Sequence, residues 1–234
     1  MAPLATSAFV SSLRAIPHLP ANSWYYLASV AFAVLNRPAE IPLIYTLASS
    51  PSSLPQSSLL PPPPPPPSSS SSSSFPSPTP PPPGDDDVLN RTREALLKAA
   101  AIGGLPSTIN ALNALRGAVA PELLDAPSPA NRTRRWNTSD GDMCIPADGG
   151  ERLWDSIYGK VGLRVMRNMR RSYDDLGAVA QLVYAGVLAP DTVLGKRETG
   201  FVLVAGLVTG GDAWAAQLKG HHRYASPSSS SSSI

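Results

Sequence analysis

The sequence is poor in the residue types that most often carry redox or metal chemistry. Its 234 residues include one cysteine, Cys144, and three histidines. A single cysteine cannot form a disulfide within the chain, which indicates a reducing, intracellular compartment. It also has no second thiol to complete a redox cycle. Because His221 and His222 are adjacent, they cannot share one helix face as zinc ligands. Neither a metal site nor a cofactor is expected.

The chain also lacks a long apolar run and an excess of charge of either sign. Its most apolar stretch, residues 24–35, is shorter than the roughly 20 residues that cross a bilayer. The net charge of +2 favours no particular partner. The one basic cluster, within residues 164–171, has no aromatic side chains between its arginines. Neither a membrane nor a nucleic acid is therefore an expected partner.

Proline and serine are abundant instead, and they are concentrated in two tracts. Residues 49–84 are almost wholly serine and proline, with seven consecutive prolines at 61–67, and residues 226–234 are mostly serine. Such segments cannot bury enough apolar surface to offset the entropy of ordering them. Both tracts are predicted to be disordered. The proline run also leaves open a scaffold role, as a ligand for an SH3- or WW-type domain.

Outside these tracts, apolar residues recur at helical spacing and no strand pattern appears. Gly103 and Gly104 are predicted to end one helix, and Pro106 to start the next. Residues 125–150 show no periodicity and are predicted to form a loop. The class predicted is all-α, a helical bundle. The helices are expected near residues 24–36, 41–48, 88–102, 106–119, 151–158, 161–171, 174–188, 196–208 and 213–224.

The last two of these helices carry the most specific pattern in the chain. Residues 199–224, TGFVLVAGLVTGGDAWAAQLKGHHRY, read as an apolar helix, a glycine turn and a helix bearing His221. This layout resembles the alkylhydroperoxidase D-like (AhpD-like) and carboxymuconolactone decarboxylase-like superfamily. Residues 22–42, 93–117 and 151–199 resemble further helices of its eukaryotic branch, in the same order. The resemblance implies an AhpD-like helical bundle that assembles as a homo-oligomer.

The resemblance also divides the chain. Residues 1–21 are expected to be a flexible N-terminus and residues 22–48 the first helices of the AhpD-like domain. A disordered Ser/Pro-rich insertion follows at 49–87, then the remainder of the domain at 88–225, shortened at its C-terminus, and a serine tail at 226–234. The cytoplasm is the expected compartment. The mitochondrion is an alternative, because the first acidic residue is Glu40 and Arg14 lies among serines and alanines.

The redox members of this superfamily carry two cysteines ahead of the histidine. The corresponding places here hold Trp214 and Gln217, which cannot form a thiolate or a disulfide. Cysteine-based peroxidase activity is therefore not expected.

The decarboxylase-type members lack the cysteine pair and act on a lactone acid. The resemblance implies proton transfer or decarboxylation on a small carboxylated substrate, with His221 as the base. Glu198 either orients His221 or pairs with its neighbours Lys196 and Arg197. A non-catalytic oligomeric relative is the alternative, so enzymatic activity stays open. The residues that would hold the carboxylate are cationic: Arg164, Arg167 and Lys219.

Overall fold

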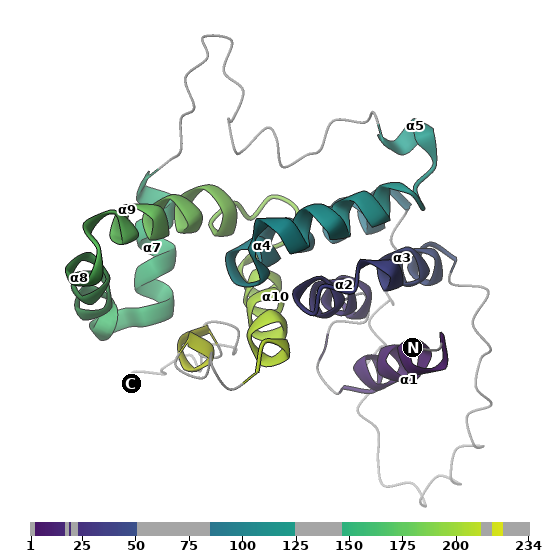
Figure 1. Cartoon of the computed structure of the whole chain (residues 1–234), viewed down its shortest axis with the longest axis horizontal. Coiled ribbons are helices and arrows are strands. Elements are labelled where there is room, and N and C mark those ends of the chain that lie inside the picture. Colours follow the sequence, from purple (N-terminus) through teal and green to yellow (C-terminus); the bar gives the residue numbers. More distant parts are fainter. Residues whose placement is uncertain are drawn as a thin grey trace, which may run out of the picture.

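A computed structural model describes residues 3–16, 19, 23–50, 85–124, 147–211 and 217–221 of the chain. Every regular element in these ranges is helical and none is a strand, as Figure 1 shows. The predicted all-α class is therefore confirmed for the described residues. Residues 51–84 of the Ser/Pro-rich insertion and residues 125–146 of the predicted loop lie outside them, as do the serine tail and Cys144. Residues 85–87 and 147–150, which were predicted to belong to the insertion and the loop, are helical.

The centre of the main core is α2 (Trp24–Val34), whose residues from Trp24 to Ala33 are all buried. A helix that is apolar on every side needs neighbours on every side. They are supplied by α3 (Ile41–Ser49), α4 (Asp85–Arg116) and α10 (Lys196–Thr209) (Figure 1). A short 3₁₀ turn, η1 (Pro38–Glu40), joins α2 to α3.

The N-terminal segment, predicted to be flexible, contains a helix, α1 (Pro3–Arg14). Val10 is buried in the main core, and the ring of Phe9 meets the ring of Phe32 edge-on, with 5.6 Å between centroids. The guanidinium of Arg14 lies 4.0 Å from the centroid of the Trp24 ring. These contacts hold α1 against α2.

Helix α4 is two helices joined at a kink. Gly104 has a φ of +80°, a left-handed conformation that disfavours a side chain, and Pro106 follows. The break predicted at this point is confirmed. By length and composition alone, residues 87–116 resemble a membrane span, although Leu96 and Ala99 pack in the core of the helical domain. A further short helix, α5 (Pro121–Leu124), follows.

The second half of the chain adds a smaller group of helices. They are α7 (Ala147–Tyr158), η3 (Gly159–Val161), α8 (Gly162–Ser172), α9 (Asp174–Val183) and the π-helix η4 (Tyr184–Leu188). The single helix predicted over 174–188 thus corresponds to α9 and η4. A second apolar cluster holds this group together: Leu153, Ile157, Leu188 and Leu203.

Two features of α7 and α10 fix the position of this second group. A Cβ built on Gly150 of α7 would lie 2.8 Å from the backbone nitrogen of Ala185, so α7 meets η4 at backbone contact. Helix α10 belongs to both clusters, because Val202 packs in the first and Leu203 in the second. In Figure 1, α10 lies between the two groups of helices.

Candidate functional site

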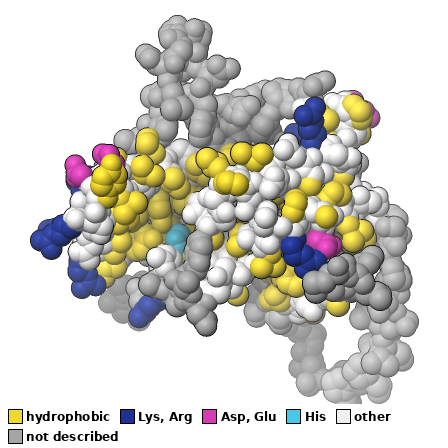
Figure 2. Space-filling model, viewed as in Figure 1, with side chains coloured by type: hydrophobic (Ala, Val, Ile, Leu, Met, Phe, Trp, Pro, Cys, Tyr) yellow, Lys and Arg dark blue, Asp and Glu magenta, His cyan; other side chains and the backbone are white. Residues whose placement is uncertain are grey.

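His221 lies in a helical stretch at residues 217–221 and lines a cavity of about 450 Å³. The side chain is buried, with 5% of its surface exposed. Figure 2 shows a histidine side chain at the bottom of a hollow that apolar side chains surround, and His221 is the one histidine among the described residues. The walls of the cavity are aliphatic side chains from α4, α9 and α10, including Ile102, Val183 and Leu207.

Two tyrosines connect His221 to α7 and η4. The hydroxyls of Tyr158 and Tyr184 are 3.0 Å apart, and the Tyr184 hydroxyl lies 3.5 Å from Nε2 of His221. Nδ1 of His221 is buried and has no hydrogen-bond partner among the described residues. Such an unsatisfied buried polar atom normally costs about 1–3 kcal/mol in a folded protein.

Burial keeps this group of side chains uncharged. It lowers the pKa of His221 to about 4, because an imidazolium would lose its hydration there. It also raises the pKa of Tyr184, which the neighbouring Tyr158 raises further. Near pH 7, His221 is a neutral imidazole and Tyr184 a neutral phenol. In a neutral imidazole, one ring nitrogen donates and the other accepts.

Sequence reasoning did not identify Lys98, which binds the backbone next to Tyr184. Its side chain is completely buried, and its Nζ donates to the carbonyls of Leu188 and Pro190, at 2.7 Å each. Glu94, one turn earlier on α4, provides a carboxylate oxygen 3.5 Å from Nζ. Because these carbonyls lie at the end of η4 and just after it, Lys98 fixes the segment that carries Tyr184. A lysine within the apolar run at residues 95–102 was the only sequence signal.

Glu198 does not orient His221. It lies in the first turn of α10, where it accepts a hydrogen bond from the backbone nitrogen of Gly195 at 3.0 Å and pairs with Arg91 of α4. The Tyr26 hydroxyl is 3.5 Å from the same carboxylate. The cavity of His221 is lined by residues one to three turns further along α10. Glu198 therefore caps α10 and ties it to α4, and its predicted pairing with Lys196 or Arg197 is replaced by the pair with Arg91.

The cationic residues predicted to hold a carboxylate are not in the cavity. Arg164 and Arg167 lie on α8 and Lys219 on the helical stretch of His221, and all of them are exposed. No charged side chain is found among the described residues that line the cavity. Gln217, one turn before His221, does line it. No group of three or more potential metal ligands occurs in the described part of the chain.

Two exposed apolar side chains form the mouth of the cavity. Leu176 and Val179 of α9 are 42% and 53% exposed, and both line the cavity. Helix α9 packs on α7 and α8 along another face, which leaves this face partly open to solvent. An apolar ligand would therefore meet apolar side chains before it reached His221.

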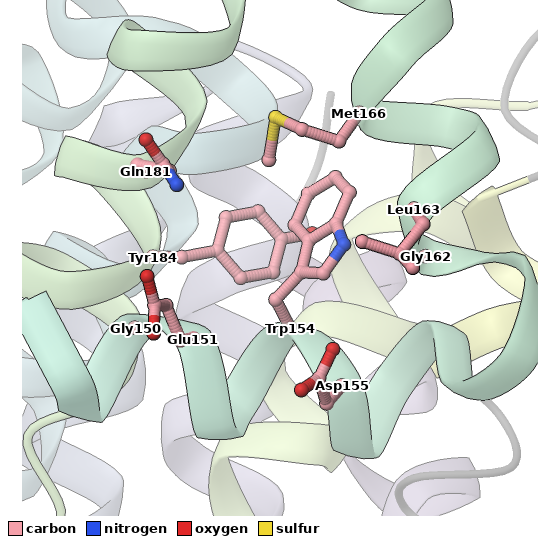
Figure 3. Close-up of a pocket in the computed structure, with 9 residues that line it drawn as sticks. All are labelled: Gly150, Glu151, Trp154, Asp155, Gly162, Leu163, Met166, Gln181 and Tyr184. Atoms are coloured by element: carbon pink, nitrogen blue, oxygen red, sulfur yellow. The ribbon is translucent and has the colours of Figure 1, made fainter.

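A second cavity, of about 290 Å³, lies between α7, α8 and α9. Figure 3 shows the Trp154 indole at its centre beside the Tyr184 ring, with Met166 above them. The centroids of the Trp154 and Tyr184 rings are 4.8 Å apart. Tyr184 is thus a wall of both cavities. The second cavity is also lined by the exposed acidic residues Glu151 and Asp155, whereas the first contains His221.

No model of a known protein family matches the chain, and no solved structure gives a significant match. Two curated proteins are similar, and both are named Peroxisomal protein 2. The protein from Saccharomyces cerevisiae is 30% identical in an alignment 234 positions long, which covers 86% of this chain and 79% of the relative. The protein from Schizosaccharomyces pombe is 33% identical in an alignment 135 positions long, which covers 56% of this chain and 57% of the relative.

These similarities correct the function inferred from the sequence. The relatives are named as peroxisomal proteins, so the prediction of a carboxymuconolactone decarboxylase-like function on a carboxylated substrate is wrong. The predicted intracellular compartment agrees with that name, whereas the cytoplasm and the mitochondrion do not. The AhpD-like resemblance gains no support from a family model or a solved structure and stays a prediction. The homo-oligomer also stays a prediction.

Proposed function

Because this chain belongs to the family of the yeast protein named Peroxisomal protein 2, we propose that it is a peroxisomal protein whose helical domain binds a small molecule. The binding site is the cavity lined by His221. The two parts of the proposal have separate support. The compartment rests on the name of the relatives, and the binding function rests on the geometry of the cavity.

The observation that carries the binding function is an apolar cavity with a small polar cluster, Tyr158, Tyr184 and His221, in its wall. Binding sites for small molecules are concave, mostly apolar and fitted with a few polar groups that fix orientation. A volume of about 450 Å³ falls within the usual range for such sites.

Blocking the mouth of the cavity tests the binding function. Val179 is half exposed at the mouth, so Val179→Trp fills the entrance without enlarging a buried side chain in the core. Leu182 is equally exposed on α9 and does not line the cavity, so Leu182→Trp is the matched control. Binding is followed by titration with Nile red, an uncharged apolar dye whose fluorescence increases in apolar surroundings.

We expect Val179→Trp to weaken Nile red binding at least tenfold and Leu182→Trp to leave it within twofold of the wild type. Equal affinities in all three proteins, or no binding to the wild type, would contradict the proposal. Thermal unfolding of each variant establishes that it is folded at the temperature of the titration.

Microscopy tests the compartment. The chain carries a fluorescent protein at its N-terminus, since some peroxisomal address signals are read at the C-terminus, and is expressed in yeast with a peroxisomal marker. We expect the two signals to coincide. A diffuse cytosolic signal, or overlap with a mitochondrial marker, would refute this part of the proposal and leave the binding function standing.

A further inference from the structure

The second cavity, between α7, α8 and α9, combines aromatic rings with negative charge. We propose that it binds a small molecule that carries a quaternary ammonium group, through the rings of Trp154 and Tyr184 and the carboxylates of Glu151 and Asp155. This site is separate from the His221 cavity, and the inference goes beyond the function proposed for that cavity.

Three of these side chains come from one face of α7. Glu151, Trp154 and Asp155 are three and four positions apart, which places them within one turn of the helix on the same side. Trp154 is buried, whereas the two acidic side chains are exposed. In the view of Figure 3, their carboxylates lie on either side of the indole. Helix α7 therefore presents an aromatic ring flanked by negative charge.

The aromatic wall of the cavity is held in place by its neighbours. The rings of Trp154 and Tyr184 meet edge-on at 69°, and Tyr158, which does not line this cavity, packs on the indole with 4.3 Å between centroids. A Cβ built on Gly162 would lie 2.9 Å from Nε1 of Trp154, so the start of α8 contacts the edge of the indole. The rings are therefore already in position for a ligand. The face of such a ring attracts a cation within about 6 Å of its centroid.

A ligand can reach this wall from solvent. The cavity is lined in part by exposed side chains, which are Leu163 of α8, 80% exposed, and the two acidic residues of α7. Its volume of about 290 Å³ is close to the lower end of the usual range for small-molecule sites. The cavity therefore fits a compact ligand rather than a long chain.

A quaternary ammonium group matches both parts of the lining. Its methyl groups pack on the rings and on the thioether of Met166, which Figure 3 shows above them. Its charge interacts with the faces of the rings and with the two carboxylates. A primary ammonium ion is more strongly hydrated and loses more on leaving water.

The charged residues around the cavity leave the two carboxylates available. Neither Glu151 nor Asp155 forms an ion pair with another described residue. Arg170 lies one turn beyond Met166 on α8, but it packs against Gly177 of α9 and does not line the cavity.

Choline and its uncharged isostere, 3,3-dimethyl-1-butanol, test the inference on the whole chain. In the isostere a carbon atom replaces the ammonium nitrogen, so the two probes have the same shape and differ in charge. Each is titrated into the protein at pH 7 and low ionic strength by calorimetry. We expect choline to bind about tenfold tighter or more, and added salt to weaken choline binding alone.

Two double variants locate the binding site. Glu151→Gln with Asp155→Asn should weaken choline binding at least fivefold and leave the affinity for the isostere within twofold of the wild type. Glu122→Gln with Asp191→Asn is the matched control, because it removes two exposed acidic side chains that do not line the cavity. This control should leave the affinity for choline within twofold of the wild type. Trp154→Leu should weaken choline binding more than either double variant.

Equal affinities of the wild type for the two probes, or no binding of choline, would overturn the inference. An equal loss of choline affinity in the two double variants would also overturn it, since the effect would then come from net charge. Because Glu151 and Asp155 are exposed, their substitution keeps the test valid if Trp154→Leu does not fold.

Sedimentation with phosphatidylcholine vesicles distinguishes two sources of the same group. Co-sedimentation that free choline prevents would assign the site to a lipid headgroup, and choline binding without co-sedimentation would assign it to a soluble molecule; both support a quaternary ammonium site. The Nile red titrations of Val179→Trp concern the other cavity, so the function proposed for it stands or falls separately.

Discussion

The buried pair of Lys98 and Glu94 leads to the largest predicted effect on stability. The side chains are 0% and 4% exposed, and Nζ of Lys98 also donates to two carbonyls at the end of η4. Lys98→Met keeps the length and apolar stem of the side chain and removes only the ammonium group. It removes the cation that lies beside the buried Glu94 carboxylate and the donor that the η4 carbonyls share.

Breaking a buried ion pair from one side costs about 3–5 kcal/mol, because an uncompensated charge stays in the core. For a domain of this size, each kcal/mol lowers the Tm by about 2–4 °C, so we expect a decrease of about 6–20 °C. The double variant Glu94→Leu with Lys98→Met removes both charges. It should be more stable than Lys98→Met alone, because replacing a whole buried pair by apolar residues is often close to neutral.

Urea unfolding followed by circular dichroism measures both variants at pH 7. Lys160→Met is the control, since Lys160 is an exposed lysine of η3 and its loss should change stability by no more than about 0.5 kcal/mol. The reasoning fails if Lys98→Met matches this control. It also fails if the double variant is less stable than Lys98→Met alone, since the cost would not then come from separating the Glu94 carboxylate from Lys98.

Three further predictions concern the cavity and its frame. Burial lowers the pKa of His221 from 6.5 to about 4, so the unfolded chain takes up a proton first. The free energy of unfolding should therefore be constant above pH 6.5 and fall by about 3 kcal/mol as the pH is lowered to 4. His221→Phe should remove this pH dependence from the free energy measured by urea unfolding. Glu198→Gln should lower the free energy of unfolding by about 1 kcal/mol, because the pair of Glu198 with Arg91 is partly exposed. It should leave the affinity for Nile red within twofold of the wild type, and a larger loss of affinity would indicate that Glu198 acts at His221. Gly150→Ala should lower the Tm more than Gly206→Ala does. The new Cβ meets the backbone of Ala185 in the first variant and the movable side chain of Ile102 in the second. Equal Tm values for the two variants would contradict this packing.

The sequence allowed most helices to be predicted, because their signals are local. Gly104 and Pro106 marked the kink of α4, and the apolar residues of α2 indicated a helix buried on all sides. The composition of α1 gave no such signal, since its buried contacts come from a few residues such as Val10 that depend on α2 being alongside.

The site was less predictable, because it depends on which helices meet. His221 was identified from the sequence, but its partners were not. Tyr184 lies 37 residues before it in sequence, and Tyr158 lies still further away. Glu198 was assigned to His221 because the two are close in sequence, yet its partner is Arg91, 107 residues distant. Spacing along the chain shows which residues share a helix face, but it does not show which helix faces them.

The protonation state of His221 tests the central claim most directly, because the uncharged cavity depends on it. Nitrogen NMR of histidine-labelled protein, with His221→Gln to assign the signal, follows the ring through a pH titration. The account predicts a neutral imidazole at pH 7 that titrates near pH 4. A signal that titrates at or above pH 6.5 would mean that His221 is a solvated cation at mildly acidic pH, and the account of a buried, uncharged His221 in the wall of the cavity would be wrong.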